Sequence, residues 1–132
     1  MPNGSSGSVR ITWFDREKAL AALRDAVRRL VDARPEIEEV ILFGSLATGQ
    51  PVPGSDADLL VILRSSEEPF LERIPRYIPS GCGIDVDVFP YTREEIGKMQ
   101  AGGNPLVKEA LEHGLVLFKR GAGGSREAGR KT

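Results

Sequence analysis

Residues 42–63 read LFGSLATGQPVPGSDADLLVIL, and residues 84–96 read IDVDVFPYTREEI. The first stretch connects the apolar run 40–43 with a second apolar run, 59–63, that follows Asp58, and the second stretch alternates between apolar and polar residues from Ile84 to Val88. Short apolar runs bounded by glycine or proline are typical of buried strands, and strict alternation also indicates a strand. The sequence therefore predicts three strands, at 40–43, 58–63 and 84–89.

Helical patterns precede and separate these strands. Apolar residues at helical spacing predict an amphipathic helix over 15–33, ended by Pro35. The residues that make this pattern are Leu20, Leu23, Val27, Leu30 and Val31. A second, short helix is expected over 68–77, where Pro75 limits its length.

The C-terminal third of the chain carries two helix-start signals. Thr92 and Glu95 have the spacing of a capping box, and Asn104 with Pro105 forms a cap and first-turn pair for a helix ending near Gly114. A final strand is expected over 115–118. The alternation of helices and strands predicts a small α/β or α+β sheet domain.

Length and composition limit the possible classes of protein. The 132 residues leave room for one domain, expected over 10–120, with disordered Gly/Ser-rich ends at 1–9 and 121–132. Eighteen basic and nineteen acidic residues give a net charge of −1, which does not favour nucleic-acid binding. The single cysteine excludes an internal disulfide and cysteine-rich zinc motifs. No signal peptide or membrane span is recognised, so a cytoplasmic domain is expected.

Aspartates occur where strands are expected, and aspartate is depleted in strands. Asp56 and Asp58 stand two apart at the start of the second strand, and Asp85 and Asp87 stand two apart in the third. Residues two apart in a strand point to the same face, where unpaired carboxylates repel each other. A divalent cation offsets that repulsion, and Mg²⁺ takes carboxylates together with phosphate oxygens. Either pair alone could also be turn chemistry or a solvent-exposed edge.

A Gly-Ser pair follows the first strand directly. Gly44 permits close approach of an anion to the backbone, and the Ser45 hydroxyl adds a donor for a phosphate oxygen. Ten residues separate Ser45 from Asp56. A phosphate-binding turn next to a pair of carboxylates predicts a nucleoside triphosphate site.

This spacing resembles that of the minimal nucleotidyltransferases of the DNA polymerase β superfamily. The shared signature is Gly-Ser, ten residues, Asp-x-Asp, and then a third acid between hydrophobic residues on a later strand, and it covers roughly residues 40–96. The resemblance implies a small mixed β-sheet with helices packed on one side. It also implies transfer of a nucleoside monophosphate from an NTP, usually ATP, to a hydroxyl, with release of pyrophosphate.

The resemblance assigns a role to each residue of the signature. Gly44 and Ser45 would hold the triphosphate, and Asp56 and Asp58 would bind two Mg²⁺ ions. Asp87 would complete the metal site and help to deprotonate the acceptor hydroxyl. Asp85 stays open as the alternative third acid.

Two departures from the family pattern bear on function. Many members carry arginines in the turn after Gly-Ser, where this chain has Leu46 and Thr48. These 132 residues leave no room for the second, helical domain that larger relatives use for the acceptor, so a second subunit or a partner protein is expected to supply that site. Minimal nucleotidyltransferases are commonly paired with small helical HEPN proteins as antitoxins, which makes a HEPN-type partner one expectation. The alternative function is a non-catalytic antitoxin module with a weakened nucleotide site.

Overall fold

Four strands form one mixed sheet in the computed structural model, which describes residues 16–44, 47 and 57–121. In chain order the strands are β1 (Ile37–Phe43), β2 (Ala57–Leu63), β3 (Val86–Thr92) and β4 (Leu115–Lys119). Their spatial order is β3-β2-β1-β4. β2 and β3 run parallel, whereas β1 is antiparallel to both β2 and β4.

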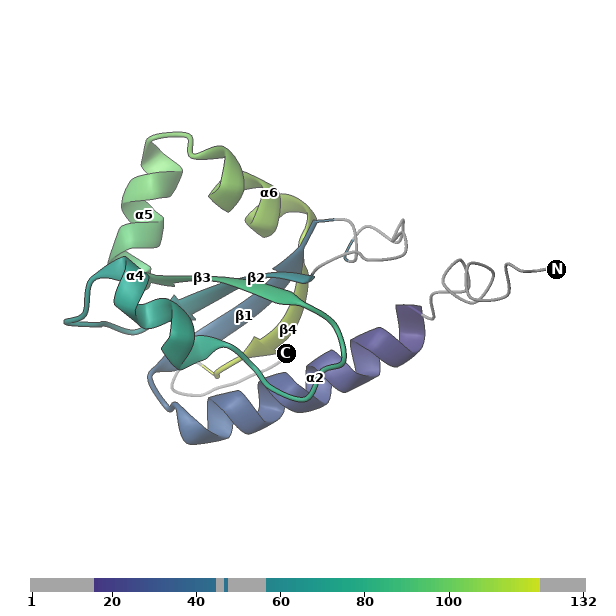
Figure 1. Cartoon of the computed structure of the whole chain (residues 1–132). Helices are drawn as coiled ribbons and strands as arrows, with labels where there is room; N and C mark the ends of the chain where they lie inside the picture. The colour runs from purple at the N-terminus through teal and green to yellow at the C-terminus, as the bar shows by residue number, and fades with distance from the viewer. Residues whose placement is uncertain (1–15, 45–46, 48–56, 122–132) are drawn as a thin grey trace, which may run out of the picture.

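Helices cover both faces of this sheet (Figure 1). The helical elements are α2 (Arg16–Ala33), α4 (Phe70–Arg73), the 3₁₀ helix η1 (Ile74–Tyr77), α5 (Arg93–Ala101) and α6 (Pro105–His113). α2 packs on one face through side chains such as Leu23 and Val27. α5 and α6 pack on the opposite face through Ile96 and Val107.

The fold class predicted from the sequence is confirmed, but the one-sided placement of the helices is wrong. The central strands β1 and β2 are buried along almost their whole length, with Val40 and Leu59 facing α2 and Ile41 and Leu60 facing α5 and α6. Strands that are apolar at consecutive positions bury both faces and therefore need a helical layer on each side.

The two predicted caps are confirmed. The Thr92 hydroxyl accepts a hydrogen bond from the Glu95 amide at 3.1 Å, and the Glu95 carboxylate accepts one from the Thr92 amide at 2.9 Å. The Asn104 side chain accepts from the Val107 amide at 3.1 Å. These bonds satisfy amides at the first turns of α5 and α6, which otherwise lack partners.

Three predicted elements differ from the structure. The strand expected over 40–43 begins three residues earlier, at Ile37. The strand expected over 84–89 begins at Val86 and continues through Pro90 to Thr92. β3 is an edge strand, and proline is tolerated there because its missing amide leaves no partner strand unpaired. The helix expected over 68–77 is divided into α4 and η1, with Pro75 in the first turn of the 3₁₀ helix.

Every helix in the described part of the chain is too short or too polar to cross a bilayer. Apart from Gly121, the ends predicted to be disordered, 1–9 and 121–132, lie outside the described residues.

Candidate active site

The carboxyl end of β1 forms one wall of the candidate site. β1 ends at Phe43, and Gly44 follows with a φ of 86°, in the left-handed region that favours glycine. A Cβ atom added at Gly44 would lie 2.5 Å from Asp58 Oδ2. The amide of Ala47 donates to the Gly44 carbonyl at 3.1 Å, which turns the chain at this point. Glycine therefore allows the backbone after β1 to lie directly against a carboxylate.

Asp58 and Asp87 are register partners on neighbouring strands. In the parallel pairing of β2 with β3, Asp58 is opposite Asp87, and in the antiparallel pairing with β1 it is opposite Phe43. Asp58 shares its face of the sheet with Leu60, which packs toward α5 and α6, and Asp87 shares that face with Phe89. The Cα atoms of neighbouring strands lie only about 4.8 Å apart. The fold thus brings two of the three predicted carboxylates together on one face.

Asp85 lies outside the strand in which it was predicted. Because β3 begins at Val86, Asp85 precedes it, and the Asp85 carbonyl accepts a hydrogen bond from the Ala57 amide at 2.9 Å. Both Asp85 and Asp87 are exposed, whereas Asp58 is half-buried. The register pairs Asp87, and not Asp85, with Asp58, so Asp87 is the better placed third acid.

Ser45 and Asp56 lie outside the described residues. Among residues 16–44, 47 and 57–121, no group of three or more His, Cys, Asp or Glu side chains is placed to hold a metal ion.

An aromatic pair lies on the same face of the sheet as the two carboxylates. The rings of Phe43 on β1 and Phe89 on β3 have centroids 5.7 Å apart and are tilted by 52°. They belong to the apolar layer between the sheet and helices α5 and α6. Asp58, opposite Phe43 on β1, is half-buried beside this apolar layer, whereas Asp87 is exposed to water.

A buried arginine fixes the far end of β3, the strand that carries Asp87. Arg73 Nη1 donates to the Pro90 carbonyl at 3.0 Å and to Glu95 Oε1 at 2.7 Å, and Nη2 donates to Glu95 Oε2 at 3.0 Å. Its Nε donates to the Glu68 carbonyl at 2.8 Å. The hydrogen bonds from Arg73 hold the pKa of Glu95 at about 2, well below its usual range. The edge strand is thereby attached to both α4 and α5.

Comparison with known proteins identifies the family to which this chain is related. A family model described as "Nucleotidyltransferase domain" matches residues 20–117. This range contains β1, β2 and β3 completely and the first three residues of β4. The chain belongs to the nucleotidyltransferase domain family. The resemblance predicted from the sequence is thereby confirmed, and so is its consequence that the protein is a transferase.

Individual relatives agree with this family. A protein of Methanocaldococcus jannaschii, provisionally named a protein adenylyltransferase, is 27% identical over 106 residues, which are 75% of this chain and 97% of that protein. Among solved structures, a provisionally assigned nucleotidyltransferase from Sulfolobus solfataricus has a TM-score of 0.56 and 22% identity, covering 80% of this chain and 84% of that one.

Two further solved structures are toxin–antitoxin complexes. One, determined with AMP-PNP, has a TM-score of 0.53 and 20% identity, covering 74% of this chain and 73% of that one. The other is a mutant of the toxin–antitoxin MntA–HpeT, with a TM-score of 0.52, 18% identity and the same coverage. At this level of identity the similarity shows the fold of the nucleotidyltransferase.

One residue of this nucleotidyltransferase was not identified from the sequence. Arg16, at the start of α2, has no role in the predicted site, but its Nη2 donates to the Ala47 carbonyl at 3.2 Å. This contact places a guanidinium beside the turn that follows Gly44. No local signal marks it, because Arg16 and Ala47 are 31 residues apart and meet only through the packing of α2 on the sheet.

The described donors of the nucleotidyltransferase fit a hard divalent cation. Asp58 and Asp87 supply carboxylate oxygens from two neighbouring strands on one face. Magnesium is typically bound by one or two carboxylates, waters and substrate phosphate oxygens. Gly44, whose added Cβ would collide with Asp58 Oδ2, leaves the space beside that carboxylate open. These residues therefore suit Mg²⁺ bound together with a triphosphate.

Proposed function

We propose that this nucleotidyltransferase transfers AMP from ATP to a hydroxyl of a partner protein or small molecule, with Mg²⁺ at Asp56, Asp58 and Asp87. The observation that carries the proposal is the register pairing of Asp58 with Asp87 beside Gly44. Paired aspartates on strands are unfavourable for stability, because like charges repel at this distance. A function that needs two carboxylates at one point accounts for their presence.

Each site residue would have a distinct task in the reaction. The backbone at Gly44 and the hydroxyl of Ser45 would bind the triphosphate. Bound Mg²⁺ would neutralise the phosphate charge and polarise the α-phosphorus. The Asp87 carboxylate would accept the proton of the acceptor hydroxyl, whose oxygen forms a bond to the α-phosphorus as the bond to the bridging oxygen of pyrophosphate breaks. Asp56 and Asp58 would hold the reacting groups in line.

The positive charge that family members place in the turn after Gly-Ser could come from another element here. In the sequence, Leu46 and Thr48 follow Gly-Ser at positions where many family members have arginine. Arg16 brings its guanidinium to the Ala47 carbonyl from the start of α2. We propose that Arg16 supplies part of this missing charge to the bound phosphates.

The proposed partner rests on what is known of similar proteins. Two of the similar solved structures are toxin–antitoxin complexes, one of them determined with AMP-PNP. The Methanocaldococcus relative carries a name that gives a protein as acceptor. We therefore propose that the acceptor is a protein, for which a HEPN-type toxin is the first candidate, and that this chain acts in the cytoplasm.

The second candidate function is a non-catalytic antitoxin module. The sequence of the turn after Gly44, which carries no arginine at 46–48, favours it over a tight nucleotide site. In that case the fold and partner binding would persist while ATP is bound weakly or not at all.

Isothermal titration with ATP and Mg²⁺ separates the two functions. The enzyme should bind nucleotide, and Asp58→Asn should lose binding in Mg²⁺, whereas the matched control Glu94→Gln, an exposed carboxylate on α5, should not. Absence of binding heat at millimolar nucleotide with a folded wild-type protein would overturn the enzymatic proposal. Incubating the protein with ATP and its co-purified partner, followed by mass spectrometry for an added AMP, then tests the acceptor.

A further inference from the structure

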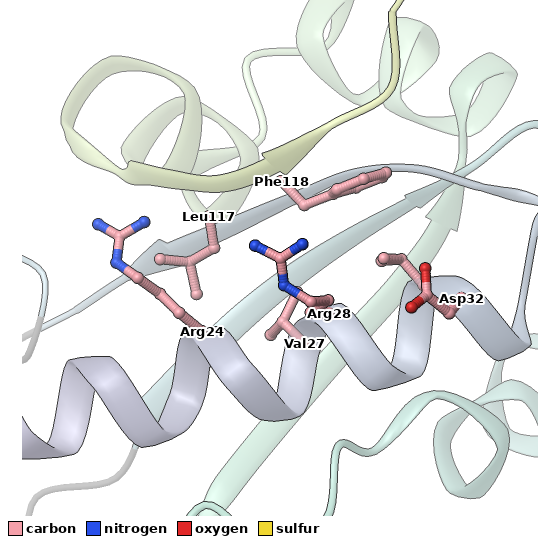
Figure 2. Close-up of a pocket in the computed structure, with 7 residues that line it drawn as sticks. Arg24, Val27, Arg28, Asp32, Leu117 and Phe118 are labelled. Carbon is pink, nitrogen blue, oxygen red and sulfur yellow. The ribbon is translucent and has the colours of Figure 1, made fainter.

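A groove of about 190 Å³ runs between helix α2 and the edge strand β4, away from the candidate active site (Figure 2). Val27 and Val31 of α2 form its apolar side together with Leu117 and Phe118 of β4. The two valines are buried, whereas Leu117 and Phe118 are half-buried and accessible in the groove. Its base is therefore apolar surface.

The side chains of two arginines of α2 extend along this groove. Figure 2 shows the guanidinium groups of Arg24 and Arg28 extending from the helix beside Leu117 and Phe118. Within the part of the chain that the structure describes, neither guanidinium has an ion pair or a hydrogen bond. Arg29, the next residue on the helix, instead pairs with Asp25 and donates to the Ser80 carbonyl at 2.8 Å. Available cationic donors are thus concentrated on the groove side of α2.

The apolar wall on β4 results from an irregularity of that strand. Val40 of β1 is opposite Phe118, but Ile41 is opposite Val116, so Leu117 is an extra residue in β4. Consecutive residues of a regular strand point to opposite faces, whereas a bulge changes the direction of a side chain. Leu117 and Phe118 consequently both line the groove, although they are adjacent in sequence.

A third cation, Arg120, lies beside Phe118, one of the residues that line the groove. The guanidinium carbon of Arg120 is 5.1 Å from the centroid of the Phe118 ring, and Arg120 Nε donates to the Ile37 carbonyl at 3.0 Å. Asp32 is the one acidic residue among those that line the groove. The whole chain has a net charge of −1, so this cationic groove is a local feature and not a result of composition.

We propose that the α2–β4 groove docks an acidic segment of a partner protein. A bulky apolar side chain of that segment rests on Val31, Leu117 and Phe118, and neighbouring carboxylates pair with Arg24 and Arg28. Arginine binds carboxylates through paired hydrogen bonds, and apolar centres with polar rims are the usual composition of protein interfaces. This docking does not depend on the transfer reaction.

A nucleic acid fits the groove less well. Binding to a phosphate backbone relies on several lysine and arginine contacts, and its strength depends on their number. Here two free guanidinium groups flank an apolar base, and the carboxylate of Asp32 lies at the same rim. Buried apolar surface between two cations suits a side chain flanked by carboxylates.

A random peptide library displayed on phage, selected on the immobilised full chain, tests this inference. We expect the selected peptides to combine Asp or Glu with Leu, Ile, Met or an aromatic residue. The double substitution R24E/R28E should weaken binding of synthetic versions by about tenfold or more, and added salt should weaken binding to the wild type. The matched control is K98E/K108E on α5 and α6, which changes the net charge equally and should leave the affinity unchanged.

The variants also show how the inference could fail. Thermal melts verify that R24E/R28E remains folded, which its exposed positions favour. Selected peptides without acidic residues, or peptides that bind R24E/R28E as well as the wild type, would overturn the proposal. Self-association in solution that R24E/R28E abolishes would show that a second copy of the chain occupies the groove, and would overturn it as well. None of these outcomes depends on whether the protein binds ATP.

Discussion

At the scale of single residues, the side chain of Asp58 connects the parts of the candidate site. It is opposite Phe43 on β1 and opposite Asp87 on β3, and its Oδ2 is next to Gly44. Because these residues are all neighbours of Asp58, a substitution at any one of them changes the surroundings of the carboxylate pair.

Asp87→Asn should lower the transfer rate by at least about a hundredfold while stabilising the metal-free protein. Removing one of two neighbouring like charges should contribute about 1 kcal/mol, which raises the melting temperature of a domain of this size by roughly 3–6 °C in EDTA. Asp85→Asn is the matched control, because Asp85 precedes β3 and has no register partner among the acids. Equal losses of activity in the two variants would contradict the assignment of Asp87 as third acid.

Gly44→Ala should abolish the stabilisation that ATP and Mg²⁺ confer. The new Cβ would collide with Asp58 Oδ2, in addition to the backbone strain of a residue held at positive φ. Gly83→Ala provides the control, because Gly83 has a φ of 76° and no atom within 4 Å of an added Cβ. Both variants should lose about 1–2 kcal/mol from strain, but only Gly44→Ala should lose the thermal shift with ATP and Mg²⁺. A normal shift in Gly44→Ala would remove Gly44 from the site.

Among the elements, edge strand β3 is predicted from the sequence, but its two ends are not. Alternation from Ile84 to Val88 predicts the strand, and the capping pair Thr92 and Glu95 predicts the helix after it. The predicted strand ends at Phe89, whereas β3 continues through Pro90 to Thr92, because proline is tolerated in an edge strand. The bonds from Arg73 to Pro90 and Glu95 connect segments 17 and 22 residues apart, and no local pattern encodes them.

The Arg73–Glu95 pair should make stability depend on pH in acid. Because the folded pKa of Glu95 is about 2, below its ordinary 4.5, the pair contributes fully above pH 4.5 and its contribution is lost as pH falls toward 2. Glu95 is 40% exposed, so screening reduces the effect to about 1–2 kcal/mol. Glu95→Gln should therefore be less stable than wild type by about this amount at pH 6, and the difference should shrink toward pH 2 in urea unfolding.

Glu94→Gln is the control for this pH dependence. Glu94 is the next residue on α5, is 79% exposed and pairs only with exposed Lys98 in the described part of the chain. Its substitution should shift stability by less than about 0.5 kcal/mol at every pH. A Glu95→Gln difference that stays constant from pH 6 to pH 2 would show that the pair does not titrate as described.

For the molecule as a whole, the predicted fold class and family are confirmed, whereas the predicted placement of all helices on one face of the sheet is wrong. The runs 40–43 and 58–63 identified the central strands, and the Gly-Ser to Asp-x-Asp spacing identified the family. Consecutive apolar residues in these runs imply that both faces of the sheet are buried. The resemblance, in contrast, implies helices on one face only. The α2–β4 groove could not be predicted, because it arises from a bulge in β4 and the packing of a distant helix.

Gly114 joins the α6 layer to edge strand β4 and tests how strongly the two sides of the sheet depend on each other. A Cβ added there would lie 3.0 Å from the Leu42 carbonyl and in closer conflict with the Ala110 carbonyl and Ile41 Cγ2. Since Ile41 and Leu42 belong to the buried central strand, neither α6 nor β1 can move away cheaply. Gly114→Ala should cost about 2–4 kcal/mol in free energy of unfolding.

Gly97→Ala in α5 is the contrasting substitution. No atom lies within 4 Å of a Cβ at Gly97, and alanine is favoured over glycine inside a helix by about 0.5–1 kcal/mol. Urea unfolding should therefore show a stabilised Gly97→Ala and a destabilised Gly114→Ala, with a single transition in each because both layers share the same central strands. Separate transitions in Gly114→Ala, or a loss of less than about 0.5 kcal/mol, would mean that α6 and β4 are attached more loosely than their packing on β1 indicates.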